Sequence, residues 1–448
     1  MKKAMAVRFT FSRSVPSVLV FLFMLSAAIP PLAAQDFGFG SIDTDGVGGF
    51  GGGSPLTVSI GGEIQASLVG FVEEFRDGAE HTRLGDIFSG KLNFTADTSH
   101  VRGVINFGLR TSDNPITIDE AYLSGFFGIL DLTTGLRKLA WGRADVMSPL
   151  DVINPMDFSD LTDLSDMMSL KIARPLIHAS LRFGQFSRLE GVFVPNFAPA
   201  RFAENGRWEP PQLAALSQLP PGFVIRPDTT TLNYAQAGVR FTTTIGGVAD
   251  IGIQYYYGRL TNPAITQTFT DPMLPPVITF AYNPYHQIGI DWAQVLFGFN
   301  IRAELAGNIT TDLDGTDGAI YNPSLAWSLG FDRDLFWGIN LNIQCNETIR
   351  LLDSKISDPY DIEADSDIMS TLIIASLSKK FMRDELEVRA AALWEVESGA
   401  CLIMPGITWT RNDVAIELSA GIFAGNNEGL FGQFRDNSFL KVGIKYTF

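Results

Sequence analysis

Apolar and polar residues alternate along most of this chain with the two-residue period of extended strands. The last strand of the pattern, residues 438–448, shows this most clearly, because Leu440, Val442 and Ile444 fall on one face and Lys441 and Lys445 on the other. Alternation alone fits both a soluble sheet with one buried face and a barrel that spans a membrane.

The alternation predicts about eighteen strands after residue 55, with sixteen as the second choice if the weakest pair is misassigned. Apolar residues rarely gather into helical stripes, so the predicted fold class is all-β. The predicted strands cover residues 56–72, 84–96, 101–111, 117–127, 130–142, 168–184, 189–194, 230–244, 248–258, 287–294, 297–307, 324–332, 336–349, 368–379, 385–396, 402–410, 414–425 and 439–448.

Short and long connections alternate between these strands. Short ones fall at residues 97–100, 128–129, 185–188, 245–247, 333–335, 380–384 and 411–413, and longer ones at 143–167, 195–229, 259–286, 309–323, 350–367 and 426–438. Transmembrane barrels have short periplasmic turns and long external loops, and the C-terminus should lie on the short-turn side. The spacing therefore predicts a transmembrane, antiparallel, up-and-down β-barrel.

The two faces of the predicted strands carry different chemistry. Arginines recur on the polar faces, for example Arg102 and Arg110, which suits a water-filled lumen better than a dry interior. Rings on the apolar faces indicate membrane-interface girdles, with packing in a large soluble domain as the alternative. These rings are Tyr255, Tyr257, Trp292, Trp327, Trp337, Trp394, Trp409 and Tyr446.

The first 34 residues are typical of a cleaved secretory signal peptide. Lys2, Lys3, Arg8 and Arg13 precede an apolar run of about 11 residues, which is too short to span a bilayer, and small residues end at Ala34. Residues 35–55 are glycine-rich, and we expect a flexible segment before a barrel domain at 56–448.

Charge and composition exclude several function classes. A net charge of -16 argues against a nucleic-acid partner. Cys345 and Cys401 are distant in sequence, so unpaired thiols are favoured over a disulfide. The histidines are scattered and no nucleophile motif occurs, so we predict no metal, no cofactor and no enzyme activity.

The end of the chain resembles the terminal strand of bacterial outer-membrane β-barrels, which close with an aromatic residue, usually Phe. Tyr446 and Phe448 match that pattern. The resemblance implies that these two residues are the signal read by the barrel-assembly machinery. It also implies a location in the outer membrane of a diderm bacterium, with outer-membrane lipid as a partner.

Residues 119–166 depart from simple alternation and carry three short motifs. They are Glu120-Ala121-Tyr122-Leu123, then Trp141-Gly142, then Ile153-Asn154-Pro155 with Asp157. Here the chain resembles a family of functionally uncharacterised Gram-negative outer-membrane barrels with an E-A-Y-L strand, a G-R-x-x-x-x-W-G strand and an I-N-P-x-D loop. Leu136-Arg137 replaces the usual Gly-Arg. The resemblance implies a barrel more firmly than it implies a substrate.

The loop after Gly142 is rich in aspartate. Our hypothesis is that it folds inward, narrows the pore and faces lumenal arginines, so that a transverse field favours polar solutes. The alternative is that the aspartates cap turns of an external loop. The candidate residues are Asp145, Asp151, Asp157, Asp160 and Asp163, facing Arg102, Arg110, Arg137, Arg182 and Arg240.

These patterns favour a porin-like channel for passive diffusion of small polar, anionic-to-neutral solutes. Two alternatives are a barrel that transports hydrophobic or lipid-like ligands, and a non-conducting surface barrel that acts as an adhesin or scaffold. The proline-rich segment 195–229 fits a lid over the mouth or an ordered external loop. A homo-oligomer is compatible with the sequence, which identifies no interface.

Overall fold

The computed structural model describes residues 56–77, 88–111, 115–164, 168–269 and 273–448. The chain divides into two units, residues 1–46 and 47–448, and every described residue belongs to the second. The predicted signal peptide and glycine-rich segment lie outside the described residues.

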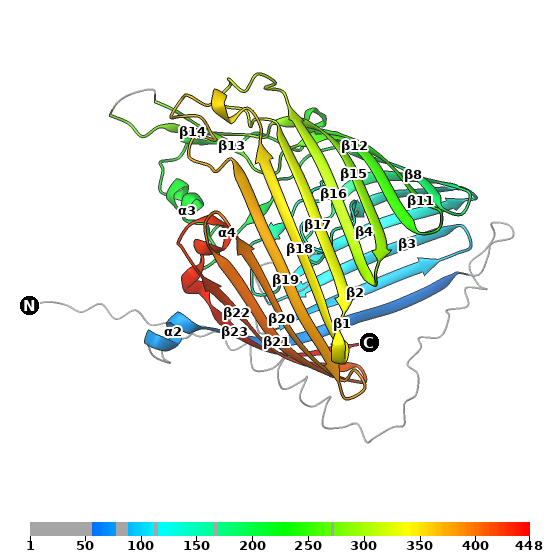
Figure 1. Cartoon of the computed structure of the whole chain (residues 1–448). Helices are drawn as coiled ribbons and strands as arrows, with labels where there is room; N and C mark the ends of the chain where they lie inside the picture. Colours follow the sequence, from blue (N-terminus) through cyan, green and yellow to red (C-terminus); the bar gives the residue numbers. More distant parts are fainter. Residues whose placement is uncertain (1–55, 78–87, 112–114, 165–167, 270–272) are drawn as a thin grey trace, which may run out of the picture. The chain divides into compact units, whose positions relative to one another are not determined.

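Eighteen strands form one antiparallel sheet, in which each strand pairs with the next wall strand along the chain (Figure 1). β1 (Thr57–Phe71) pairs with β23 (Phe439–Thr447), with Ser67 opposite Gly443, so the sheet closes on itself. Closure leaves no edge with unpaired backbone groups, which a strand structure inside a bilayer requires. The predicted all-β barrel of eighteen strands is confirmed.

The other wall strands follow in chain order. They are β2 (Phe88–Asp97), β3 (Val101–Arg110), β4 (Ile116–Phe127), β5 (Leu130–Arg137), β7 (Arg174–Phe183), β8 (Ser187–Val194), β11 (Gln236–Ile245), β12 (Ala249–Arg259), β15 (Pro284–Leu296), β16 (Phe299–Thr310), β17 (Ser324–Asp334), β18 (Ile339–Arg350), β19 (Met369–Phe381), β20 (Leu386–Glu395), β21 (Cys401–Arg411) and β22 (Val414–Ala424).

Short elements occupy the loops of the long-loop end and the turn before β18. They are α2 (Val72–Asp77), α3 (Pro211–Ser217), α4 (Gly429–Gly432), η2 (Leu232–Tyr234), η3 (Phe336–Gly338), η4 (Asp353–Lys355) and η5 (Arg435–Asn437), with β10 (Val224–Ile225), β13 (Ala264–Thr268) and β14 (Val277–Ala281) in a small sheet and β6 (Asp157–Phe158) beside β9 (Arg201–Phe202). In the described residues no helix is long and apolar enough to cross a membrane.

Each predicted strand overlaps one wall strand, and the largest differences lie around the longest loops. The strand predicted at 130–142 ends at Arg137, and the one predicted at 168–184 begins at Arg174. Residues 138–142 and 168–173 keep an alternating pattern although they belong to a loop, because they pack inside the barrel.

Tight turns join strands at one end of the barrel, and longer loops generally join them at the other, as predicted. The turn between β11 and β12 is built on Gly246 and Gly247, with φ of 61° and 68°. Two successive positive φ angles are the mark of a type I′ turn, which matches the twist of the flanking strands. Both Thr57 and Thr447 lie at the short-turn end.

The outer surface of the wall is apolar. On β23, Leu440, Val442 and Ile444 are 46–50% exposed while Lys441 between them is 4% exposed, and the same alternation runs round the sheet. The outward residues include Leu68, Ile105, Leu123, Ile177, Val239, Ile253, Ile290, Leu305, Leu329, Leu377, Val388, Ile407 and Ile416. A continuous apolar belt of this kind needs hydrocarbon around it, so the barrel is transmembrane.

The aromatic residues of the apolar faces occupy both ends of the wall. Tyr255, Tyr257, Trp327 and Trp394 lie toward the long-loop end, and Trp292, Trp409 and Tyr446 lie toward the short-turn end, with Trp337 in a turn. Two such belts are typical of the two membrane interfaces. Cys345 and Cys401 are both free, so they form no disulfide.

Candidate functional site

The segment between β5 and β7 enters the lumen, and we call its described residues, 138–164 and 168–173, the inner loop. Asn154 fixes its base. The Asn154 side chain accepts a hydrogen bond from the Leu139 N–H at 2.7 Å and donates to the carbonyls of Arg137 at 3.1 Å and Ile172 at 2.9 Å. One amide thus joins the start and end of the loop, which gives the I-N-P motif a structural role.

Glu304 on β16 holds the far end of the inner loop. Its carboxylate accepts hydrogen bonds from the backbone N–H groups of Arg143 and Ala144 and, at 2.5 Å, from the Ser148 hydroxyl. Gly142, with φ of 92°, lies beside this contact, and a Cβ there would be 2.2 Å from the Ser148 hydroxyl. Glycine is therefore required in the W-G motif by both backbone conformation and space.

A buried charge network lies beneath the loop. Arg143 from the loop binds Asp291 on β15 at 2.6 Å and Asp250 on β12 at 3.3 Å. Asp291 also binds Arg240 on β11 at 2.6 Å. Asp291 is only 1% exposed, and an unpaired carboxylate at such a depth would be costly. Two arginines, Arg143 from the loop and Arg240 from the wall, thus compensate this buried carboxylate.

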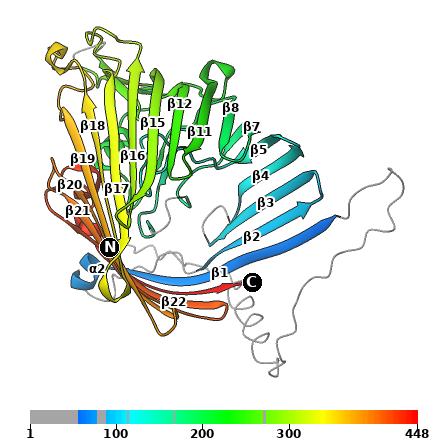
Figure 2. The same ribbon diagram turned by 45° about the vertical axis from the view of Figure 1, so that its right-hand side comes forward.

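Three glutamines of the wall bind the backbone of the loop. Gln254 on β12 donates to the Leu150 carbonyl at 2.9 Å, and Gln287 on β15 donates to the Pro149 carbonyl at 3.0 Å. Gln344 on β18 accepts from two loop N–H groups, each at 3.1 Å. The inner loop therefore starts at β5 and is bound to β12, β15, β16 and β18, which lie four to eight strands further along the eighteen-strand wall (Figure 2).

Apolar packing accompanies these polar contacts at the long-loop end. Trp141 and Ile153 of the loop pack with Val192 and Tyr256 of the wall, and Leu161 packs in a second cluster. Inward wall residues of that second cluster are Val69, Phe71, Ile374, Leu393, Leu402, Phe423 and Phe439. The inward face of the wall is therefore largely apolar at this end, where the loops pack on it.

Two predicted aspartates bind cations of the wall. Asp145 accepts hydrogen bonds from Arg302 on β16 at 2.6 Å and from Asn342 on β18 at 2.7 Å. Asp163 lies 3.1 Å from the ammonium of Lys441 on β23. These carboxylates thus attach the inner loop to opposite parts of the barrel.

The other predicted aspartates have local partners. Asp151 pairs with Lys171 of the same loop, and burial raises the pKa of the Asp151 carboxyl while the ammonium opposes that shift. Asp157 and Asp160 each accept a hydrogen bond from the N–H two residues later, at 3.1 and 2.9 Å, so both cap turns. Asp157 also binds Arg201 at 2.9 Å.

The predicted arginines are dispersed. Arg240 belongs to the charge network beneath the loop, whereas Arg102 pairs with Asp97 at 2.6 Å and Arg182 with Asp131 at 3.0 Å. Arg110 is exposed at the end of β3. The cations that bind the loop aspartates are Lys171, Arg201, Arg302 and Lys441. The sequence analysis did not identify these partners, because the alternation of apolar and polar residues does not show which loop residue contacts which strand.

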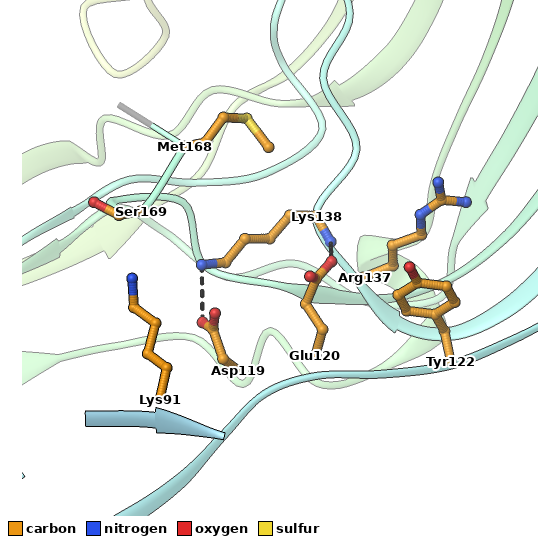
Figure 3. A pocket seen from close by; sticks show the side chains of 8 residues that line it. All are labelled: Lys91, Asp119, Glu120, Tyr122, Arg137, Lys138, Met168 and Ser169. Atoms are coloured by element: carbon orange, nitrogen blue, oxygen red, sulfur yellow. Dashed lines mark hydrogen bonds and ion pairs between the residues drawn. The ribbon is translucent and has the colours of Figure 1, made fainter. Parts of the chain in front are cut away.

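A polar pocket lies between the inner loop and the wall of β2, β4 and β5, and we call it the wall pocket (Figure 3). It has a volume of about 340 Å³ and is lined by Lys91, Asp119, Glu120, Tyr122, Arg137, Lys138, Met168 and Ser169. A β-bulge in β4, opposite Asn106 and Phe107, places consecutive carboxylates toward the pocket.

Most charges of the wall pocket are paired. Asp119 binds the Lys138 ammonium at 2.8 Å. Glu120 of the E-A-Y-L motif accepts hydrogen bonds from the Lys138 N–H at 2.8 Å and the Asn106 amide at 3.1 Å. The Arg137 guanidinium lies 5.0 Å from the centre of the Tyr122 ring.

The segment between β8 and β11, residues 195–235, covers the mouth at the long-loop end, and we call it the outer strap. Trp208 is 7% exposed and packs in the cluster that contains Phe71, Phe423 and Phe439. Arg207 binds Glu74 of α2 at 2.5 Å. The strap thus reaches from β8 and β11 to β1 and β23 across the mouth.

The closed antiparallel sheet, the apolar belt with two aromatic girdles and the loop inside the lumen define a transmembrane β-barrel of the outer-membrane type. Within the described residues, no group of three or more His, Cys, Asp or Glu side chains is placed to hold a metal ion.

The chain is similar to several barrels of known structure. No family model and no curated relative matches the chain. The chain is similar to Pseudomonas aeruginosa OccD3, with a TM-score of 0.48, 8% identity and coverage of 87% of this chain and 90% of the other. It is also similar to Wzi, described as a carbohydrate-binding barrel of group 1 capsule assembly in Escherichia coli, with a TM-score of 0.47, 10% identity and coverage of 87% and 84%.

A further similar structure is OmpF of Salmonella typhi in complex with daunomycin, with a TM-score of 0.42, 10% identity and coverage of 88% of this chain and 98% of that one. The assignment of this protein to the transmembrane β-barrels rests on its own strand pairing and on its apolar outer surface.

Proposed function

We propose that this barrel is an outer-membrane, porin-like channel for passive diffusion of small polar solutes, and that the inner loop sets its bore. The observation that carries the proposal is the binding of the inner loop to β12, β15, β16 and β18, which lie four to eight strands along the wall from β5. An eighteen-strand barrel is wide enough for an aqueous channel, so a loop across it reduces the free cross-section.

Charge at the inner loop supports selection of polar solutes. Asp145 lies between Arg302 and Asn342, and its side chain keeps 35% exposure, so it presents charge to the lumen. Charged groups exposed beside a narrow passage favour hydrated, polar molecules over apolar ones. The candidate pore residues are therefore those of the loop and of the wall that it contacts.

The wall pocket supports a route past the loop. It lies between Met168 and Ser169 of the loop and the strands β2, β4 and β5, a side of the lumen away from the glutamine contacts. Its lining is charged and polar apart from Met168 and the ring of Tyr122. We infer that polar solutes pass on this side of the barrel.

The alternative of a hydrophobic-ligand barrel has less support. The apolar cluster at the long-loop end is filled by the chain's own Leu161, Trp208, Phe431 and Phe434. A lipid-like ligand would have to displace these side chains. The surface-barrel alternative, an adhesin or scaffold, predicts no solute flux and is therefore separated from a channel by the experiment below.

We also propose that residues 1–34 direct export and are removed, and that Tyr446 and Phe448 guide assembly into outer-membrane lipid. The last residue also takes part in closure, because Phe448 and Gly62 exchange two backbone hydrogen bonds at 2.9 and 3.0 Å. Its side chain stacks on Tyr446 with ring centres 6.0 Å apart.

Liposome swelling with sugars of graded size tests the proposed function. Vesicles containing the refolded barrel should swell fastest with the smallest sugars, and swelling should cease above a size limit. A barrel without size-limited flux would refute the channel proposal. Lipid that remains bound through purification would then favour the hydrophobic-ligand alternative over the surface barrel.

A further inference from the structure

Arg137 differs from the other cations of the wall pocket in its partners. The ammonium of Lys91 binds Glu63 at 3.0 Å and that of Lys138 binds Asp119 at 2.8 Å. Across the described residues, no carboxylate lies within ion-pair distance of the Arg137 guanidinium.

The contacts of the guanidinium leave most of its N–H groups available. One of its nitrogens donates to the Thr133 hydroxyl at 3.2 Å, and the group lies 5.0 Å from the Tyr122 ring centre. A guanidinium carries five N–H donors in a planar fork that matches a carboxylate. Stacking on a ring restricts the fork and so prepares it for binding.

The position of Glu120 makes this arrangement unusual. Ala121 pairs with Leu136 in the antiparallel register, so Glu120 and Arg137 occupy the next opposed positions of β4 and β5. Opposite charges at such positions commonly pair. Here the Glu120 carboxylate instead binds the Lys138 N–H and the Asn106 amide, which leaves Arg137 facing the pocket.

The charge balance of the pocket favours an anion. Its lining holds the cations Lys91, Arg137 and Lys138 against the two carboxylates Asp119 and Glu120. The partner of Lys91, Glu63, also lies 3.8 Å from Lys445, so it compensates two lysines. This excess of positive charge occurs in a chain whose net charge is -16, and it therefore makes a local site for a negative group.

We propose that the wall pocket binds small organic carboxylates, with Arg137 as the residue that holds the carboxylate. The volume of about 340 Å³ is at the small end of ligand pockets and suits a molecule such as succinate. The ligand class deepens the proposed channel function and rests on it for the passage of the solute. Binding itself requires only that the pocket be reached from water.

Saturation-transfer NMR on the full barrel in detergent micelles tests this inference, with succinate as the probe and uncharged succinamide as its matched control. Succinate should receive saturation from the protein and should compete with acetate, whereas succinamide should show far weaker transfer. Equal transfer to both molecules would overturn the assignment of a carboxylate site.

Three variants locate the site. R137Q should weaken succinate binding at least about tenfold, because it removes charged hydrogen bonds. E120Q retains a carbonyl for the Lys138 N–H but removes a negative charge, so it should bind succinate several-fold more tightly. R333Q is the matched control, because Arg333 also stacks on a ring, Phe299, at 4.5 Å, but on the lipid-facing side. Its binding should equal that of the wild type.

The outcomes separate this inference from the channel proposal. A barrel that binds succinate through Arg137 but shows no solute flux would keep the site and refute the channel. If the barrel shows solute flux but does not bind succinate, the site alone is refuted. The same holds if R137Q and E120Q both bind succinate as tightly as the wild type does. Heat-dependent mobility in gels checks that each variant is folded.

Discussion

Single side chains of the lumenal wall determine the path of the inner loop. Glu304 receives hydrogen bonds from Arg143, Ala144 and Ser148, and it lies 160 residues from Ala144 in sequence. Asp291, Gln254 and Gln344 act in the same way from other strands. The polar residues of these strands therefore do more than face water, because they bind a loop whose own N–H and carbonyl groups need partners.

Gly142→Ala should loosen the inner loop. The new Cβ would meet Ser148 and Glu304, and a non-glycine residue at φ of 92° adds backbone strain, together about 1–3 kcal/mol. Limited trypsin digestion in micelles should then cut at Arg143. Gly128→Ala is the control, since Gly128 has a φ of 68° but open space around its Cβ position. Equal cleavage of both variants would contradict the proposed docking.

Asp145→Asn should shift ion selectivity toward anions. Asp145 presents a partly exposed carboxylate to the lumen beside Arg302, and its neutralisation removes one of the two carboxylates that bind this arginine, the other being Asp332. The measurement is the reversal potential across a planar bilayer in a KCl gradient. Asp160→Asn, which changes only an exposed turn cap, should leave the potential unaltered. A shift in neither variant would mean that ions do not pass Asp145.

At the scale of elements, strands and loops differ in how far sequence predicts them. The period of two marks every wall strand, because lipid outside and polar groups inside impose opposite chemistry on alternate residues. Leu440 and Lys441 show this contrast directly. The aspartates of the inner loop were also recognisable as a group. Their partners were not, because Arg302 and Lys441 approach them only once the barrel has closed.

The bulge in β4 shows a second limit of sequence reasoning. A strict period of two would place Asp119 and Glu120 on opposite faces, whereas the bulge lets both line the wall pocket. The outward apolar positions shift phase at the bulge, from Ile116 and Ile118 to Leu123. Such a shift marks an irregular strand, but it does not show which side chains the bulge brings together.

Trp208→Ala should detach the outer strap from the mouth. Trp208 is 7% exposed among aromatic residues, and truncation of such a side chain costs about 3–5 kcal/mol. Brief trypsin treatment of intact cells that display the barrel should then cut at Arg207. Trp337→Ala removes an 84% exposed ring from a turn and should leave the strap resistant. A resistant Trp208 variant would show that other contacts hold the strap.

The whole molecule depends on closure between its first and last strands. β23 pairs along its whole length with residues 63–71 of β1, and Phe448 extends the seam through two backbone hydrogen bonds to Gly62. The ring of Phe448 would also lie within 2.9 Å of a Cβ at Gly62, so glycine there makes room for the terminal residue. Chain closure and the predicted assembly signal thus involve the same residue.

Phe448→Ala should reduce assembly more than it reduces the stability of the folded barrel. The backbone hydrogen bonds remain in this variant, while the aromatic signal is lost. The yield of folded protein in outer-membrane fractions should fall several-fold, yet protein refolded in detergent should retain heat-dependent mobility. Leu440→Ala, also on the outer face of β23, is the control for lost apolar area. Equal yields in the two variants would contradict a special role of the terminal ring.

Single-channel conductance of a barrel with a shortened inner loop shows whether this loop sets the bore of the channel. Residues 144–151 would be replaced by a short glycine-serine linker, which keeps the base that Asn154 fixes. We expect the wild type to conduct and the shortened barrel to have a severalfold larger conductance, because the lumen loses its narrowest part. Equal conductance in the two folded proteins, or none in either, would contradict a loop that sets the bore of a channel.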